Sequence, residues 1–228
     1  EAYVEALLKE IKESAALLSE KRLATIYFGG GTPTALSAEQ LQRVISAVKQ
    51  YFPTEQAVEW TVEAGRPDTI TREKLEMLQA EGITRISINP QTMNQKTLDI
   101  IGRQHTVEQI REAFALAREV GFTNINMDLI IGLTGENAED VEETLRQIGE
   151  LQPDSVTVHT LALKRAARLN IEKEQYQGME AVQVCDMLEA TVRFAKEQEY
   201  APYYLYRQKN MEENLENVGY AREGKEGL

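Results

Sequence analysis

The stretch ATIYFGGGTPTALSAEQLQRVISAVKQYF, residues 24–52, decides the fold class. It begins with a short apolar run, 24–30, which is typical of a buried strand. A glycine-rich turn follows, and Ser37 with Gln40 forms a capping box that predicts a helix through residue 52. The stretch therefore indicates one strand, one turn and one helix in that order.

The same order recurs along the chain. We predict further strands over 57–64, 84–91, 123–133 and 155–163, and further helices over 1–19, 71–82, 94–101, 106–121, 138–150 and 180–198. A polar stretch, 164–178, interrupts this alternation, and 203–209 is predicted as a last strand with only loop after it. Strands joined by single helices form right-handed crossovers, so we expect a parallel sheet.

Two architectures satisfy this pattern of five or six strand–helix units. One is an open, doubly wound sheet, and the other is a wholly or partly closed β/α barrel. No G-x-G-x-x-G sequence opens a helix, which weakens the dinucleotide-binding form of the open sheet. The residues alone therefore predict the α/β class and leave the two architectures open.

Composition narrows the classes of protein. Of the 228 residues, 42% are hydrophobic and 27% are charged, which is ordinary for a globular chain and excludes a mainly disordered one. The net charge of −12 repels phosphate backbones, so we expect neither nucleic acid nor a membrane as a partner. The one cysteine, Cys185, permits no internal disulfide and favours a cytoplasmic location. Its place in VQVCDML predicts that it is buried on an apolar helix face.

No change of composition marks a second domain, so we expect residues 1–228 to form a single domain. The chain opens directly into the amphipathic helix EAYVEALLKEIKESAALL and stops at GKEGL. We expect it to be a piece of a longer protein, truncated at both ends.

Polar residues collect where the predicted strands end. These positions are Gly29 to Pro33 after the first strand, Glu63 on the second, Asn89 and Gln91 on the third, Asp128 on the fourth and His159 on the fifth. In parallel α/β folds the carboxyl ends of the strands form the binding site. An unpaired carboxylate inside an apolar strand costs several kcal/mol, so each acid needs a partner or a function.

Each of these features also has a purely structural interpretation. The glycine triplet before proline is compatible with a plain tight turn. Glu63 or Asp128 could pair with a core arginine, and His159 could be a hydrogen-bonded wall residue. The run Lys164, Arg165, Arg168 could be a solvated loop. What favours a site is that glycines, two carboxylates, an amide and Arg103 gather at one kind of position.

Such a set of residues suits a small ligand with an amine, a carboxylate and a ribose. Backbone groups at a glycine turn can approach an amino group closely because no Cβ intervenes. Arginine binds a carboxylate through two parallel hydrogen bonds, while Asp and Gln suit vicinal hydroxyls.

Five motifs together resemble the radical S-adenosylmethionine (SAM) enzymes, and specifically the oxygen-independent coproporphyrinogen III oxidases, also called coproporphyrinogen dehydrogenases. They are YFGGGTPTAL (27–36), TVEA (61–64), RISINPQTM (85–93), GRQH (102–105) and NMDLIIGL (126–133). HTLALKRAARL (159–169), YYLYRQKNM (203–211) and ENVGYA (216–221) look most like the HemZ-type branch. The likeness covers essentially the whole chain.

The resemblance implies a partial (βα)6-type barrel that binds SAM and a [4Fe–4S] cluster. Carried over to this sequence, Gly30, Gly31 and Thr32 would lie against the methionine end of SAM, with Glu63 as a polar contact. Gln91 and Asp128 would hold the ribose hydroxyls, Arg103 the carboxylate, and the backbone of Ala162 the adenine. In this family SAM yields a 5′-deoxyadenosyl radical that takes a hydrogen from a propionate, and loss of CO2 and an electron leaves a vinyl group.

One departure from the family pattern concerns the cluster. The family's C-x-x-x-C-x-x-C motif lies upstream of the first helix, where this chain begins, and Cys185 matches none of its three ligands. We therefore expect the parent protein to be a radical SAM oxidoreductase of haem biosynthesis and this polypeptide to be inactive. An electron donor for the cluster is the second partner that the resemblance implies.

Two other functions stay open. Related proteins are haem chaperones, which carry an HN-x-x-YW segment; the matching NMEENLENVGYA lacks it, which favours the oxidase branch. The other alternative is a ligand-free structural α/β domain. If the enzyme interpretation holds, a substrate with several propionates needs local positive charge, and we expect Lys164, Arg165 and Arg168 to supply it, with Arg207 and Lys209 near the same opening.

Overall fold

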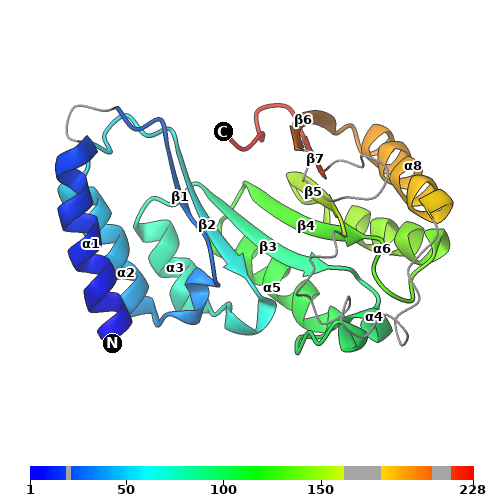
Figure 1. Ribbon diagram of the computed structural model, residues 1–228, viewed down its shortest axis with the longest axis horizontal. Coiled ribbons are helices and arrows are strands. Elements are labelled where there is room, and N and C mark those ends of the chain that lie inside the picture. Colours follow the sequence, from blue (N-terminus) through cyan, green and yellow to red (C-terminus); the bar gives the residue numbers. More distant parts are fainter. Residues whose placement is uncertain (19–21, 162–180, 207–216) are drawn as a thin grey trace. The chain divides into compact units, whose positions relative to one another are not determined.

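The computed structural model describes residues 1–18, 22–161, 181–206 and 217–228 (Figure 1). The chain divides into two compact units. Unit 1 contains residues 1–88, 113–123 and 227–228, and unit 2 contains 89–112 and 124–226. The strand order of the sheet is β1-β2-β3-β4-β5-β7-β6.

Unit 1 is built from α1 (Ala2–Leu18), β1 (Thr25–Phe28), η1 (Pro33–Ala35), α2 (Ala38–Tyr51), β2 (Glu59–Gly65), η2 (Pro67–Thr69), α3 (Arg72–Ala80) and the first part of β3 (Arg85–Gln91). Both β1 with β2 and β2 with β3 pair in parallel, as predicted. Helix α1 packs on α2, and α2 on α3 (Figure 1). The fully buried side chains of this unit include Leu41, Ile45, Leu75, Leu78 and Ile86.

Sequence-local features set the helix boundaries in unit 1. The Ser37 side chain accepts from the backbone N–H of Gln40, whose own side chain accepts from the N–H of Ser37. Thr71 caps α3 by accepting from the N–H of Lys74. Both caps satisfy N–H groups that the first helical turn leaves without partners, which is why they could be predicted from spacing alone.

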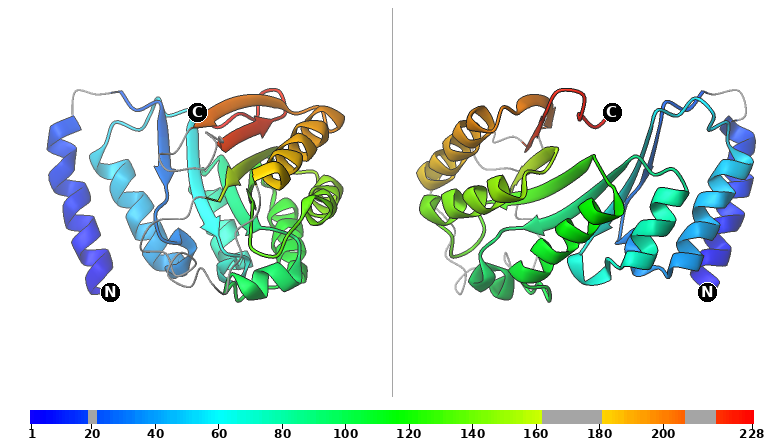
Figure 2. Two further views of the ribbon diagram at one scale, coloured as in Figure 1. Left: turned by 45° about the vertical axis from the view of Figure 1, so that its right-hand side comes forward. Right: turned by 180° about the vertical axis from the view of Figure 1, so that it is seen from behind.

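Unit 2 contains α4 (Gln95–Ile100), β4 (Ile125–Ile131), α6 (Ala138–Leu151), β5 (Ser155–Thr160), α8 (Ala181–Glu197), β6 (Ala201–Tyr206) and β7 (Asn217–Ala221). Helix α5 (Val107–Val120) is shared between the units, and Thr106 with Gln109 forms the predicted capping box at its start. Helices α6 and α8 pack together and lie along one face of β4 and β5 (Figure 2).

Alternation along β4 separates two faces. Ile125, Met127 and Leu129 are buried toward the helices, whereas Asn126 and Asp128 project from the opposite face. The core of unit 2 therefore lies between the sheet and its helices, and the other face carries the polar residues. In the described part of the chain, no helix is long and apolar enough to cross a membrane.

The C-terminal part of the chain differs from the prediction. We predicted only loop after a strand at 203–209, but Asn217–Ala221 forms strand β7. It lies between β5 and β6 and is antiparallel to both, so the expected parallel pattern ends at β5. The segment is five residues long and contains a glycine, so its strand character comes from its partners rather than from a local pattern.

Candidate functional site

The predicted site residues fall into two groups, and each group lies within one compact unit. Gly30, Gly31, Thr32 and Glu63 belong to unit 1. Gln91, Arg103 and Asp128 belong to unit 2. Ala162, Lys164, Arg165, Arg168, Arg207 and Lys209 lie outside the described residues.

The glycine turn of unit 1 follows β1 and is exposed. Gly30 has φ 103°, a conformation that side chains disfavour, and a Cβ built on Gly30 or Gly31 would meet open space. Gly29 differs, because a Cβ there would lie 3.3 Å from the Glu63 carboxyl carbon and closer still to the Tyr27 ring. The turn therefore presents backbone to its surroundings on one side and packs against Glu63 on the other.

Glu63 is half-buried on β2 and is held in place by two features. The Tyr27 hydroxyl donates to its Oε1 at 2.5 Å. The ladder between β2 and β3 shifts register between Glu63 and Gly65, and such a bulge redirects a side chain at the end of a strand. Gly65, with φ 50°, lies against Thr32, because a Cβ there would come within 2.9 Å of the Thr32 methyl group. The structure thus places two of the four predicted residues of unit 1, Thr32 and Glu63, at the same end of β2.

Lys74 on α3 holds the two short helices η1 and η2 in place. Its Nζ donates to the carbonyl oxygens of Thr34 at 2.6 Å and Thr69 at 3.1 Å. The buried Thr34 hydroxyl donates to the carbonyl oxygen of Ala64 at 2.9 Å. Burial lowers the pKa of the Lys74 ammonium. These bonds anchor the segment after the glycines to the end of β2.

In unit 2, strand β3 ends on a residue with an unusual backbone. Gln91 has φ 71°, in the left-handed region that non-glycine residues rarely occupy. Its side chain is buried, and its Nε2 donates to the carbonyl oxygen of Asn89 at 3.4 Å. Such a conformation costs about 1–3 kcal/mol and persists where surrounding contacts hold it.

Buried hydroxyls and a carboxyl group supply those contacts. The Thr92 hydroxyl donates to Glu136 Oε1 at 2.6 Å and lies 3.2 Å from the Thr144 hydroxyl. The backbone N–H of Met93 donates to the same Thr144 oxygen at 3.2 Å. The residues that follow Gln91 are thereby tied to the loop after β4 and to helix α6.

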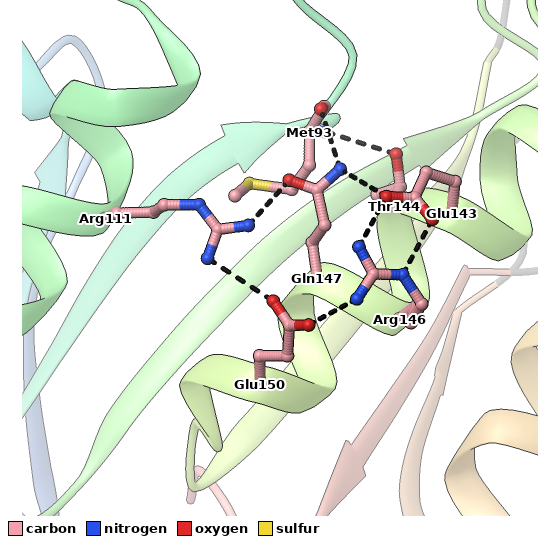
Figure 3. A network of polar contacts seen from close by, with 7 residues as sticks. All are labelled: Met93, Arg111, Glu143, Thr144, Arg146, Gln147 and Glu150. Atoms are coloured by element: carbon pink, nitrogen blue, oxygen red, sulfur yellow. Dashed lines mark hydrogen bonds and ion pairs between the residues drawn. The ribbon is translucent and has the colours of Figure 1, made fainter.

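A network of surface side chains also contacts Met93, in the loop after β3 (Figure 3). Gln147 Nε2 donates to the carbonyl oxygen of Met93 at 3.4 Å, and Arg111 donates to Gln147 Oε1 at 2.8 Å. Arg111 also lies 3.6 Å from Glu150, which pairs with Arg146. Exposed pairs of this kind contribute little individually, so we assign the network a role in fixing the loop rather than in overall stability.

Glu136 is the most deeply buried acid near this loop, with 4% of its surface exposed. Burial raises the pKa of its carboxyl group, and hydrogen bonds from Thr92 and Thr97 offset part of that rise. Its place after Gly132 and Gly135, both with positive φ, puts it at the carboxyl end of β4.

Asp128 is half-buried on β4, and the amide of Asn126 is one of its partners. Asn126 Nδ2 donates to Asp128 Oδ1 at 2.6 Å. The Asn126 oxygen in turn accepts from the hydroxyls of Ser155 at 3.0 Å and Thr157 at 3.1 Å. Because both hydroxyls fix the amide, the Asp128 carboxylate is held in one orientation on the polar face of the strand.

Arg103 is half-buried in the loop between α4 and α5. Gly102, with φ 73°, turns the chain there, and the Arg103 N–H donates to the carbonyl oxygen of Leu98 at 2.9 Å. Its backbone is therefore fixed by the end of α4.

The predicted burial of Cys185 is wrong. The thiol is exposed, because Val184 and Met187 form the buried face of α8 and Cys185 lies about 100° around the helix from Val184. Among the described residues, no group of three or more His, Cys, Asp or Glu side chains could hold a metal ion.

Comparison of the sequence with known protein families shows to which family the chain belongs. The Radical SAM superfamily matches residues 1–148. The chain belongs to the radical SAM superfamily. The family resemblance found in the sequence is thereby confirmed.

Named relatives place this radical SAM chain more closely. It is 49% identical over 208 residues to the oxygen-independent coproporphyrinogen-III oxidase-like protein HemZ of Bacillus subtilis (strain 168), covering 91% of the chain and 42% of that protein. It is 35% identical over 163 residues to the heme chaperone HemW of the same strain, covering 71% of the chain and 43% of HemW. The chain spans less than half the length of these relatives.

A solved structure confirms the α/β fold of the family. Coproporphyrinogen III oxidase HemN from Escherichia coli, described as a radical SAM enzyme, superposes with a TM-score of 0.80 at 28% identity. The match covers 98% of this chain and 49% of HemN.

Sequence reasoning missed four residues of this radical SAM chain that orient the predicted ones: Tyr27, Thr92, Asn126 and Glu136. Two of them were within reach of the pattern that found the others. Asn126 shares a strand face with Asp128 at a spacing of two, and Glu136 follows two glycines just beyond the same strand. The Thr92 hydrogen bond spans 44 positions, which no local pattern reveals.

Proposed function

We propose that this chain is the SAM-binding core of an oxidoreductase that converts propionate side chains of coproporphyrinogen III into vinyl groups. Support comes from membership of the radical SAM superfamily and from the relatives named above. Since the chain covers less than half of those relatives, the activity is proposed for the whole protein. Its location would be the cytoplasm, and its partners a porphyrinogen and an electron donor.

The residues present fit SAM. The space where a Cβ would stand at Gly30 and Gly31 is open, so backbone groups there can reach the amino group of a ligand. The exposed turn at Gly30 and Gly31, beside the Glu63 carboxylate that Tyr27 orients, is the observation on which the proposal rests. Bound SAM would supply the hydrogen-abstracting chemistry for which the superfamily is named.

Each residue then has a role in holding SAM. Glu63, oriented by the Tyr27 hydroxyl, accepts a hydrogen bond at the methionine end beside Thr32. Asp128, oriented by Asn126, accepts from the ribose hydroxyls together with Gln91. Arg103 pairs with the ligand carboxylate, and the backbone of Ala162 binds the adenine.

The residues present do not fit a [4Fe–4S] cluster. Such clusters need several thiolate ligands, and the single cysteine of these 228 residues is exposed on α8. We therefore propose that the ligands of the cluster come from outside this sequence. The basic residues Lys164, Arg165 and Arg168 remain the proposed contacts for the substrate carboxylates.

The decisive experiment compares two acids of unit 2 in the whole protein with its cluster reconstituted. Asp128→Asn should weaken SAM binding by about 1.5–3 kcal/mol in calorimetry, because one charge-assisted hydrogen bond is lost. Asp154→Asn is the matched control: Asp154 accepts from the backbone N–H of Ile125 at 2.8 Å, so its loss should lower stability and leave SAM affinity unchanged.

Product analysis separates oxidase from chaperone. Anaerobic incubation with coproporphyrinogen III should yield vinyl product in the wild type and much less in Asp128→Asn. Haem binding without any vinyl product would favour the chaperone alternative that the HemW relatives represent. Unchanged SAM affinity in Asp128→Asn, with a collapsed melting temperature, would make that carboxylate a structural residue.

A further inference from the structure

Four neighbouring strands of unit 2 place one residue each in a single row. Asp128 on β4 is paired with Thr157 on β5. Thr157 is in turn paired with Gly219 on β7, and Gly219 with Tyr204 on β6. Paired residues of neighbouring strands project from the same face of a sheet, so the whole row belongs to the face that carries Asp128.

The middle of this row is low. Thr157 has a short side chain and Gly219 has none. Gly219 is buried, because the Tyr203 ring lies against it, so the half-buried Thr157 is the accessible low position of the row. Thr157 lies one strand spacing, about 4.8 Å, from Asp128 on one side and from Gly219 on the other, and we call it the floor. The opposite face is already occupied, because Val156, Val158 and Tyr220 are buried on it. In the described part of the chain, the side of Asp128 is therefore the one from which a ligand can reach this part of the sheet.

A β-bulge brings two aromatic rings against Gly219, beside this floor. The β6–β7 register shifts between Pro202 and Tyr204, which leaves Tyr203 as the extra residue. A Cβ on Gly219 would lie 3.0 Å from Cε1 of Tyr203 and 3.1 Å from Cβ of Tyr204, so both tyrosines meet the same face of Gly219. Their ring centroids are 6.5 Å apart and the rings are tilted by 42°.

We propose that Tyr203 and Tyr204 form an aromatic ledge that holds one pyrrole ring of the substrate beside them, above Thr157. This inference rests on the proposed function, since it names the subsite for that substrate. Tyrosine faces bind flat π-systems at a small entropic cost. Tyr203 is half-buried, and 48% of the Tyr204 surface is exposed, so ring area is available to a ligand.

Charge favours a ring over a propionate at this place. The row contains one ionised side chain, the Asp128 carboxylate, which repels carboxylates and tolerates an uncharged ring beside it. A pyrrole held here would lie with its N–H group toward polar oxygens and its propionate directed away from Asp128. The ledge thus selects which part of the macrocycle faces the SAM residues of unit 2.

The test uses coproporphyrin III, the stable oxidised macrocycle, titrated into the chain while its main absorption band is followed. Tyr203→Leu keeps apolar volume and removes the ring, and it should weaken binding about two- to tenfold. Tyr203→Phe keeps the ring and should bind like the wild type. Tyr3→Leu on α1 is the matched control, because Tyr3 is 70% exposed and far from this row in sequence; it should change nothing.

Calorimetry with SAM on the same samples separates the two proposals. Tyr203→Leu should leave SAM affinity unchanged. If coproporphyrin binds wild type and Tyr203→Leu equally while SAM binding persists, the ledge is wrong and the proposed function stands. If Tyr203→Leu loses coproporphyrin affinity but the whole protein forms no vinyl product, the ledge stands and the oxidase function falls. Should Tyr203→Leu fail to fold by circular dichroism, Tyr204→Leu, on the more exposed ring, gives the same comparison.

Discussion

The turns after β1 and β3 both follow the carboxyl end of a strand, yet they are built by opposite means. The first uses Gly30 at φ 103°, is exposed, and presents its backbone. The second uses Gln91 at φ 71°, is buried, and is held by side-chain hydrogen bonds through Thr92 and Glu136. A turn that offers backbone can use glycine without strain, whereas a turn that must offer a side chain needs buried contacts to hold a strained residue.

The largest expected effect on stability comes from removing the buried carboxyl group of Glu136, which holds the turn after β3. Glu136→Ala removes the 2.6 Å hydrogen bond from the Thr92 hydroxyl and leaves a cavity where the carboxyl group was buried, so we expect the free energy of unfolding to fall by about 2–4 kcal/mol. Urea denaturation measures this. Glu142→Ala, on an exposed part of α6, should stay within about 0.5 kcal/mol of wild type. Equal stabilities of the two variants would show that the loop after β3 does not depend on Glu136.

An intermediate effect is expected at the glycine turn. A methyl group has open space at both Gly30 and Gly31, but only Gly30 has a positive φ. Gly30→Ala should therefore lower the free energy of unfolding by about 1–2 kcal/mol, and Gly31→Ala should change it by less than about 0.5 kcal/mol. Thermal unfolding of the pair is sufficient. A similar loss in both variants would mean that crowding, not backbone conformation, limits the turn.

A smaller effect should follow when the strained glutamine is relieved. Gln91→Gly removes the strain together with the side chain, so stability should change by less than about 1 kcal/mol while SAM affinity falls about two- to tenfold. Gln152 provides the control, because it has φ 53° at the end of α6. Gln152→Gly should raise stability by about 0.5–1 kcal/mol without any change in SAM affinity. A fall in SAM affinity in the control would invalidate the assignment of Gln91.

The smallest expected effect is the pH dependence of stability that the Glu136 carboxyl group causes. Because burial raises the pKa of Glu136 above its ordinary value of 4.5, the folded chain binds that proton more tightly than the unfolded chain. The contribution of Glu136 to stability is therefore greatest below the unfolded pKa and is lost as pH rises through the folded one. The stability of Glu136→Gln relative to wild type should accordingly increase with pH across this window. A difference that is independent of pH would show that the carboxyl is not perturbed.

The fold could be predicted from sequence wherever its cause is local. The capping boxes at Ser37 and Thr106 and the apolar runs of the first five strands depend on residues within a few positions of one another. Strand β7 could not be found, because its pairing with β5 joins residues more than 50 positions apart. The burial of Cys185 was mispredicted since one position along a helix changes the direction of a side chain by about 100°.

The candidate site divides in the same way. Strand ends and residue chemistry are enough to select Gly30, Glu63, Gln91 and Asp128 as expectations. Which neighbours orient them depends on tertiary contacts: Tyr27 reaches Glu63 across 36 positions, and Ser155 reaches Asn126 across 29. Sequence patterns indicate what a side chain can bind, whereas tertiary packing determines its orientation.

The position of β7 between β5 and β6 has a consequence for how the chain is made. Strand β6 is synthesised first, yet among the described strands it pairs only with β7, so it must wait until residues 217–221 have left the ribosome. During that interval APYYLY is an uncharged aromatic segment with open hydrogen-bonding groups, which is a template for aggregation. Pro202 lacks an N–H group, so it hinders a second chain from adding to this strand before its own partner arrives.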